Sequence, residues 1–115
     1  MPSTTSFEFG DVLLVPFPFT DQSGVKRRPA VVVSSASYNQ KRPDLVLIGV
    51  TSQVRKASRL DLVIAEWRKA GLVTPSAVKP VLATLEKRIV LKKLGRLEKP
   101  DRVALEALLR RIFTP

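Results

Sequence analysis

Short apolar runs separated by polar turns dominate the first three quarters of the chain. The runs at 12–15 and 30–33 are too short for helices, and the second is rich in valine, so both are interpreted as buried strands. Further runs at 45–52, 59–64 and 75–85 complete the pattern. Together these runs predict a small antiparallel barrel or a strongly curled sheet of five strands. Pro80, inside the last run, predicts that this strand is at an edge or is interrupted there.

Helical spacing occurs clearly once, near the end of the chain. Pro100 and Asp101 stand where a helix should start, and apolar residues recur on one face after them, at Leu105, Leu108, Leu109 and Ile112. This pattern predicts a C-terminal helix that packs on the sheet as a lid.

The remaining segments are expected to be short helices and loops. Residues 66–70 read as one or two turns of helix closed by Gly71, with Trp67 as a core anchor or, alternatively, a surface for stacking on a base. Residues 88–94 read as a helical turn stopped by Gly95, and 36–44 as a polar loop.

The length of the chain predicts one domain. A chain of 115 residues can bury a sufficient core without disulfides or a structural metal, and no repeat or long linker divides it. Residues 1–6 are small and polar, and are expected to be a disordered lead-in to this domain, 1–115. No apolar run approaches the roughly 18 residues of a membrane span, and no leader pattern precedes the first strand. The expectation is a soluble, cytoplasmic protein.

Charge points to an anionic partner. Lysine and arginine total 20 against 10 acidic residues, which gives a formal charge of +10. Nucleic acid is the first candidate, with an acidic protein or an anionic membrane as alternatives and a merely solvated basic surface as the simplest one. Because the chain has no histidine, this charge hardly changes between about pH 5 and pH 8.

Missing residue types exclude several kinds of catalysis. Without histidine, neither a paired-histidine ribonuclease mechanism nor a histidine-containing triad can operate. Without cysteine or histidine, zinc binding is not expected, and the scattered carboxylates show no paired motif for a two-metal nuclease. No metal and no cofactor is therefore expected.

The segment between the first two strands has the composition of an exposed loop. Pro16 and Pro18 lack backbone donors, and residues 21–24 supply turn chemistry. Phe17 and Phe19 flank Pro18, where they either stack on unpaired bases or, more often for such positions, pack or make a dimer contact.

Three consecutive cations end this loop. Lys26, Arg27 and Arg28 precede Pro29, which pushes Arg28 into an extended conformation and so aims its guanidinium. The third strand ends in hydrogen-bonding side chains, of which Thr51 is the first. In a small barrel the start of the second strand and the end of the third can share a face.

A guanidinium and a hydroxyl that converge in this way suit a phosphate. Arg28 offers a bidentate fork and Thr51 a single donor, while RNA brings its own nucleophile in the 2′-hydroxyl. The simpler alternative is that Arg28 pairs with a carboxylate and Thr51 caps a strand. Flanking phosphates would be held by nearby polar and basic side chains: Lys26, Arg27, Ser52, Gln53, Arg55 and Lys56.

Blocks of sequence along nearly the whole chain resemble a known family. GDVLLVPFPFTDQSGVKRRPAVVVSS, then RPD before LVLIGVTSQ, then EWRKAGLVTPSAVKP and KKLGRLEKPD occur in the order found in the PemK/MazF family of toxins from bacterial toxin–antitoxin pairs.

The resemblance implies a fold and an activity. It implies a mainly β, SH3-like barrel with a short inserted helix and a C-terminal helix, which dimerises, cuts single-stranded RNA without metal and is silenced by an acidic antitoxin. By resemblance Arg28 and Thr51 are catalytic, and the products are a 2′,3′-cyclic phosphate and a 5′-hydroxyl. Arginine is a poor base, so a third group is needed, for which Asp21 is a candidate. The alternative is a non-catalytic nucleic-acid-binding or gyrase-inhibiting protein of the same fold, as in the CcdB branch.

Overall fold

The computed structural model describes residues 6–17, 26–54 and 61–114. The described elements follow the order β1 (Asp11–Phe17), β2 (Lys26–Val32), α1 (Ala36–Lys41), β3 (Asp44–Thr51), β4 (Leu62–Val63), β5 (Ala77–Glu86), the 3₁₀ helix η2 (Lys87–Ile89), β6 (Lys92–Arg96) and α2 (Lys99–Phe113). Residues 1–5 of the expected lead-in, and residues 59 and 60 of the predicted fourth strand, lie outside the described residues.

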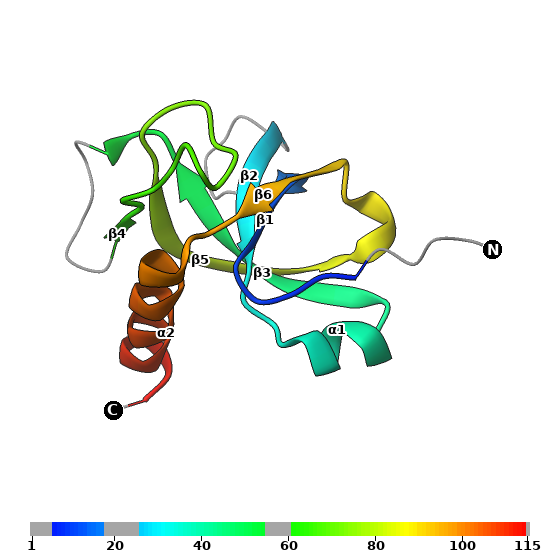
Figure 1. Ribbon diagram of the computed structural model, residues 1–115. Helices are drawn as coiled ribbons and strands as arrows, with labels where there is room; N and C mark the ends of the chain where they lie inside the picture. Colours follow the sequence, from blue (N-terminus) through cyan, green and yellow to red (C-terminus); the bar gives the residue numbers. More distant parts are fainter. Residues whose placement is uncertain (1–5, 18–25, 55–60, 115) are drawn as a thin grey trace.

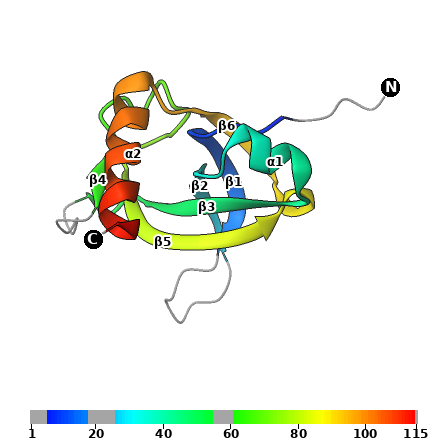
Figure 2. The same cartoon turned by 90° about the horizontal axis from the view of Figure 1, so that it is seen from below.

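The strands form one curled antiparallel sheet. Their order is β4-β5-β3-β2-β1-β6, and every recorded neighbouring pair is antiparallel. Figures 1 and 2 show the sheet bent into a half-barrel, with α2 on one side and α1 on the other. The predicted mainly β barrel with a C-terminal helix is confirmed.

Each face of the sheet carries its own hydrophobic core. One cluster includes Val12, Val31 and Ile48 and is covered by α2, while the other includes Leu13 and Val32. Val12 and Leu13 are adjacent in β1 yet belong to different clusters, because successive side chains of a strand point to opposite faces. The strands β1, β2 and β3 therefore support both cores.

The sixth strand was not predicted. Residues 88–94 were expected to form a helical turn stopped by Gly95, but η2 ends at Ile89 and β6 pairs with β1. Gly95 lies inside β6, where a Cβ would come within 2.4 Å of the carbonyl oxygen of Ala70. The glycine marks a close approach of two backbones and not the end of a helix.

The loop expected at 36–44 is also wrong, because α1 lies there. The Ser35 side chain caps the helix by accepting a hydrogen bond from the Tyr38 amide at 3.1 Å. Asn39 is 2 % exposed, and its side-chain amide donates to the carbonyl oxygen of Phe7 at 2.9 Å. Buried polar contacts replace the apolar stripe that would have revealed this helix.

Residues 65–71 form hydrogen-bonded turns where a short helix was expected. The Ala70 amide donates to the Glu66 carbonyl at 3.1 Å, and Gly71 closes the segment with a φ of 87°. The Asp101 carboxylate holds the segment by accepting hydrogen bonds from the amides of Ala65 and Glu66, at 3.0 and 2.9 Å. This connection ties the first turn of α2 to the chain that leads into β5.

The last helix and the interrupted strand match their predictions. Leu105 and Leu108 of α2 are 0 % and 4 % exposed in the core. The pairing of β3 with β5 shifts register between Ile48 and Val50, opposite the part of β5 that contains Pro80. Among the described residues, no helix has the length and apolar character needed to cross a membrane.

Candidate functional site

Arg28 lies near the start of β2, partly buried. Its cross-strand partner in β1 is Val15, and Lys26 lies opposite Phe17. Strand alternation puts Arg28 and Lys26 on the same face as Ala30 and its core cluster, and Arg27 on the opposite face. The three consecutive cations therefore do not act as one block.

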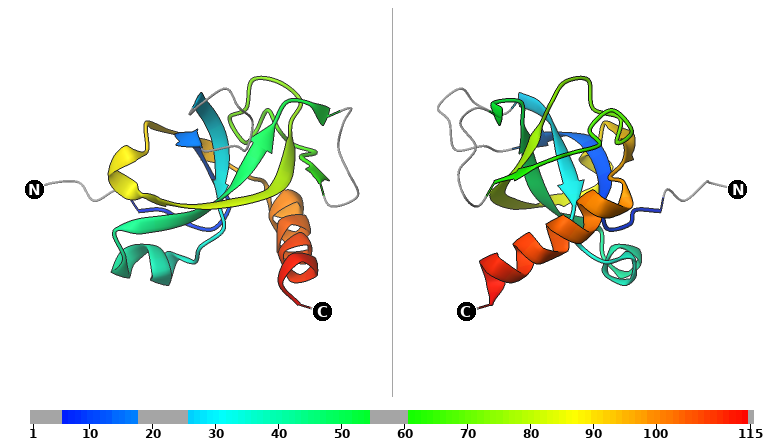
Figure 3. Two further views of the ribbon diagram at one scale, coloured as in Figure 1. Left: turned by 180° about the vertical axis from the view of Figure 1, so that it is seen from behind. Right: turned by 60° about the vertical axis from the view of Figure 1, so that its left-hand side comes forward.

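Arg28 and Thr51 lie beyond the same end of the pairing between β2 and β3. The recorded pairs of β2 with β3 are Val32 with Leu47, Val31 with Ile48, and Ala30 with Gly49. The recorded pairing ends at Ala30 and Gly49, and Arg28 and Thr51 each lie two residues beyond that pair, where strand alternation puts Arg28 on the face of Ala30 and Thr51 on the face of Leu47. Figures 1 and 3 show the start of β2 and the end of β3 at the same end of the sheet.

The Thr51 hydroxyl is oriented by the chain that follows it. Its oxygen accepts a hydrogen bond from the Gln53 amide at 3.1 Å, so its own hydrogen can be donated elsewhere. Thr51 is partly buried, whereas Ser52 and Gln53 are exposed just beyond the strand. The end of β3 thus presents one held hydroxyl and two accessible polar side chains.

The other candidate residues are divided by what the structure describes. Lys26 and Arg27 are exposed at the start of β2. Asp21, Arg55 and Lys56 lie outside the described residues, as does Phe19. Phe17 is 0 % exposed inside a core, which makes it a packing residue and excludes the stacking role considered for it.

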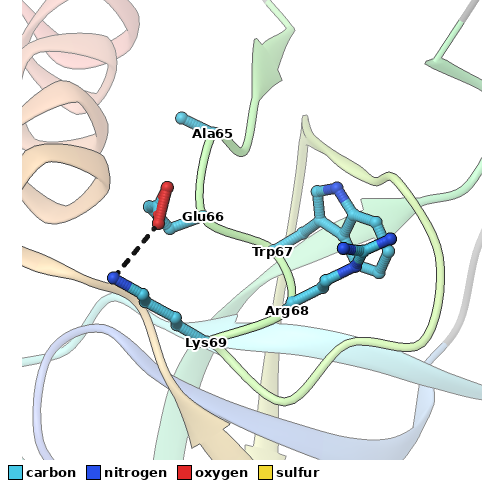
Figure 4. A pocket seen from close by; sticks show the side chains of 5 residues that line it. All are labelled: Ala65, Glu66, Trp67, Arg68 and Lys69. Atoms are coloured by element: carbon cyan, nitrogen blue, oxygen red, sulfur yellow. Dashed lines mark ion pairs between the residues drawn. The ribbon is translucent and has the colours of Figure 1, made fainter.

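Trp67 packs as the sequence predicted. It lies against the core cluster beneath α2, and the Arg68 guanidinium is 4.9 Å from its ring centroid. Figure 4 shows Arg68 over Trp67, and Glu66 pointing toward Lys69, with which it pairs at 3.6 Å. The pocket of about 470 Å³ at Ala65–Lys69 includes neither Arg28 nor Thr51.

The Asp44 carboxylate, at the opposite end of β3 from Thr51, is paired with Arg42. The pKa of Asp44 is lowered mainly by a hydrogen bond from Arg42, at 2.8 Å between Nε and Oδ1, and the pKa of Arg42 is raised by the same contact. Asp44 begins β3 and Thr51 ends it. The pair fastens the junction of α1 and β3.

A cavity beside β6 was not anticipated from the sequence. It measures about 580 Å³ and is lined by Phe7, Lys87, Arg88, Val90, Leu91, Lys92 and Lys93. A signal was present in the four cations between 87 and 93, but the expected helical turn would have spread them around an axis. The irregular chain and the strand bring them to one opening.

Comparison with known proteins identifies related sequences and folds. A family model described as a PemK-like, MazF-like toxin of type II toxin–antitoxin systems matches residues 8–113. Among curated proteins, no sequence is significantly similar to this chain.

Solved structures share the fold at low identity. MazF (Form-I) from Deinococcus radiodurans has a TM-score of 0.74 and 18 % identity, covering 98 % of this chain and 100 % of that chain. An endoribonuclease in complex with its cognate antitoxin, from a mycobacterial species, has a TM-score of 0.70 and 16 % identity, covering 94 % and 93 %. The Mycobacterium tuberculosis toxin MazF-mt6 has a TM-score of 0.71 and 16 % identity, covering 90 % and 95 %.

Proposed function

This chain belongs to the PemK-like, MazF-like toxin family of type II toxin–antitoxin systems, and from that membership we propose that it is an endoribonuclease toxin that cuts single-stranded RNA at selected sequences without metal. The observation that supports the proposal is that Arg28 near the start of β2 and Thr51 at the end of β3 each lie two residues beyond the recorded pair of Ala30 with Gly49. In the proposed mechanism these two donors of different shape bind one phosphodiester.

The proposed reaction is a transesterification within the RNA. The 2′-oxygen bonds to phosphorus, the bond from phosphorus to the 5′-oxygen breaks, and the 5′-oxygen takes up a proton. The products are a 2′,3′-cyclic phosphate and a 5′-hydroxyl. The Arg28 fork stabilises charge on the phosphorane, and the Thr51 hydroxyl donates to a phosphate oxygen. Asp21 is the candidate that removes the 2′-hydroxyl proton.

Polar and basic side chains near these two residues hold the rest of the strand. Lys26 and Arg27 lie at the start of β2, and Ser52 and Gln53 at the end of β3. Arg55 and Lys56 follow in the sequence. The same surface, in a chain of charge +10, suits an acidic antitoxin that competes with RNA.

The active form is proposed to be a homodimer in the cytoplasm.

Cleavage of a long unstructured RNA in EDTA tests the proposal. Wild-type protein is expected to cut, leaving cyclic phosphate and 5′-hydroxyl ends. Arg28→Ala and Thr51→Ala are each expected to lower the rate on the order of 10²- to 10³-fold, as for the loss of one donor to a developing charge. Circular dichroism checks that both variants fold.

Two results would contradict the mechanism. Activity that appears only when Mg²⁺ is added excludes metal-independent cleavage. Full activity in either variant removes that residue from the site. As a matched control, Lys99→Ala removes an exposed cation from α2 and is expected to cut at the wild-type rate.

A further inference from the structure

The cavity beside β6 faces solvent with an apolar floor and a basic rim. Phe7 is 7 % exposed and belongs to the core beneath the cavity, and Val90 packs against the same core. Leu91 is 50 % exposed at its edge. From this chemistry we infer that the cavity binds one nucleotide of the RNA strand; the inference rests on the proposed function.

Two of the rim cations have their charge compensated. Arg88 pairs with Glu86 at 2.5 Å, and Lys93 pairs at 3.2 Å with Asp11, which is 0 % exposed. Both cations are already balanced, so they add little net attraction for a further anion.

The other two rim cations carry the attraction. Within the described ranges 6–17, 26–54 and 61–114, no carboxylate lies at ion-pair distance from Lys87 or Lys92. Lys92 is exposed and Lys87 partly so. The cavity therefore offers two uncompensated positive charges around an apolar surface, which matches the phosphates and the flat base of a nucleotide.

Three backbone donors at the cavity are already used. The Leu91 amide donates to the Leu14 carbonyl at 2.9 Å, the Val90 amide to Lys87 at 3.1 Å, and the Lys87 amide to Pro43 at 2.8 Å. An acidic peptide that extends a sheet needs free backbone donors. These three donors are already used, but β6 has no strand on its outer edge in the described sheet, so the side chains of the cavity and not the backbone favour a nucleotide.

The sheet sets Lys92 and Arg28 on opposite faces, with one strand between them. Arg28 is opposite Val15 in β1, and Lys92 of β6 is opposite the preceding residue, Leu14. Neighbouring strands are about 4.8 Å apart, so β2 and β6 are separated by about 10 Å across β1. Because β6 is the last strand in the described sheet, an RNA strand that reaches both side chains has to pass around this edge.

Binding of a non-cleavable RNA tests the inference. Fluorescent single-stranded 2′-O-methyl RNA of mixed sequence has no free 2′-hydroxyl, so its affinity can be measured by anisotropy at several KCl concentrations. Lys87→Ala combined with Lys92→Ala is expected to reduce the slope of log affinity against log salt by about 1.4, because each lost phosphate contact accounts for about 0.7. Leu91→Ala is expected to weaken binding at least about fivefold with an unchanged slope, since it removes contact with a base and no charge.

A matched pair on α2 controls for the total charge. Lys99→Ala combined with Arg110→Ala removes two exposed cations from α2 that do not line the cavity, and is expected to leave the slope unchanged. If the two double variants reduce the salt slope equally, the attraction depends on total charge and not on the cavity, and the inference is overturned. A Leu91→Ala protein that binds like the wild type would overturn it too, because the cavity would then attract phosphate alone.

The acidic-peptide alternative has its own readout. If the Lys87 and Lys92 substitutions weaken binding of poly-L-glutamate but not of RNA, the cavity is a peptide site and the inference fails. Because every readout is binding, failure of the cleavage proposal is seen separately: a wild-type protein that does not cut in EDTA refutes the mechanism whatever the salt slopes show.

Discussion

At position 28 the shape of the cation matters as well as its charge. A guanidinium makes two parallel hydrogen bonds to phosphate oxygens, whereas an ammonium acts as a point charge. Arg28→Lys is therefore expected to lower single-turnover cleavage by about 10²-fold while RNA affinity stays near that of the wild type. Comparable losses in rate and in affinity would show that Arg28 only attracts RNA.

At position 51 the hydroxyl is the group that counts. Thr51→Ser keeps the hydroxyl donor and is expected to retain most of the cleavage rate. Thr51→Val keeps the shape of the side chain but lacks the donor, and is expected to lose most of the cleavage rate. The Gln53 amide loses its acceptor in the valine variant, so thermal unfolding must be compared to separate stability from chemistry.

Two glycines with positive φ allow a matched test of backbone strain. Gly71 has a φ of 87°, and a Cβ there would meet the Leu94 carbonyl oxygen at 2.0 Å. Gly10 has a φ of 91°, but a Cβ there would meet the flexible side chain of Arg102 at 2.7 Å. The Leu94 carbonyl cannot move away from an added Cβ as easily as the flexible Arg102 side chain can.

Gly71→Ala is accordingly expected to cost more stability than Gly10→Ala. The left-handed conformation costs each about 1–2 kcal/mol, and the clash with backbone takes Gly71→Ala to at least about 3 kcal/mol. Urea unfolding measures both changes. Equal midpoints for the two variants would mean that the approach of Gly71 to β6 is not rigid.

The sequence pointed to Arg28 and Thr51 because local chemistry marks them. Pro29 restricts the residue before it, and Thr51 ends an apolar run. What the sequence did not contain was the pairing register, which depends on contacts between segments about twenty residues apart. The sequence did not predict that the charged residues around 87–93 line one cavity, because that too depends on contacts between distant segments.

At the level of elements, Asp101 connects α2 to the turn at 65–71. It is 4 % exposed and accepts two backbone hydrogen bonds. The sequence suggested Asp101 as a residue suited to the start of a helix. Its bonds instead go to a segment that precedes it by 35 and 36 residues in the chain.

Removal of this carboxylate is expected to loosen the turn. Asp101→Ala leaves two partly buried amides without an acceptor and should cost about 2–4 kcal/mol, with Asp101→Asn between it and the wild type. Hydrogen exchange at the amides of Ala65 and Glu66 should accelerate most. Glu106→Ala, an exposed change on the same helix, is the control. Unchanged exchange at 65 and 66 would refute the connection.

Elements with a clear apolar pattern were predictable and polar ones were not. The strands β1, β2, β3 and β5 and the helix α2 follow from apolar runs and helical spacing. The helix α1 was missed because its buried residue is Asn39, and β6 because lysines fill an edge position. Such elements are defined by partners elsewhere in the fold, and local preference does not reveal them.

For the whole molecule, a charge of +10 without histidine makes salt the controlling variable. RNA affinity is expected to fall with log salt at a slope of about −3.5 for about five phosphate contacts, and to change little between about pH 5 and pH 8. Anisotropy titrations with 2′-O-methyl RNA measure both. A large change in affinity across this pH range would require a titrating group that the composition does not supply.

The sheet with a core on each face has a consequence for unfolding. Because Val12 and Leu13 are neighbours in one strand but belong to different cores, neither side can melt and leave the other intact. Loss of either core exposes the strands on which the other rests. Heat and denaturant should therefore unfold the protein in a single cooperative step. In hydrogen exchange of the native protein, the amides of β1, β2 and β3 should be the most protected.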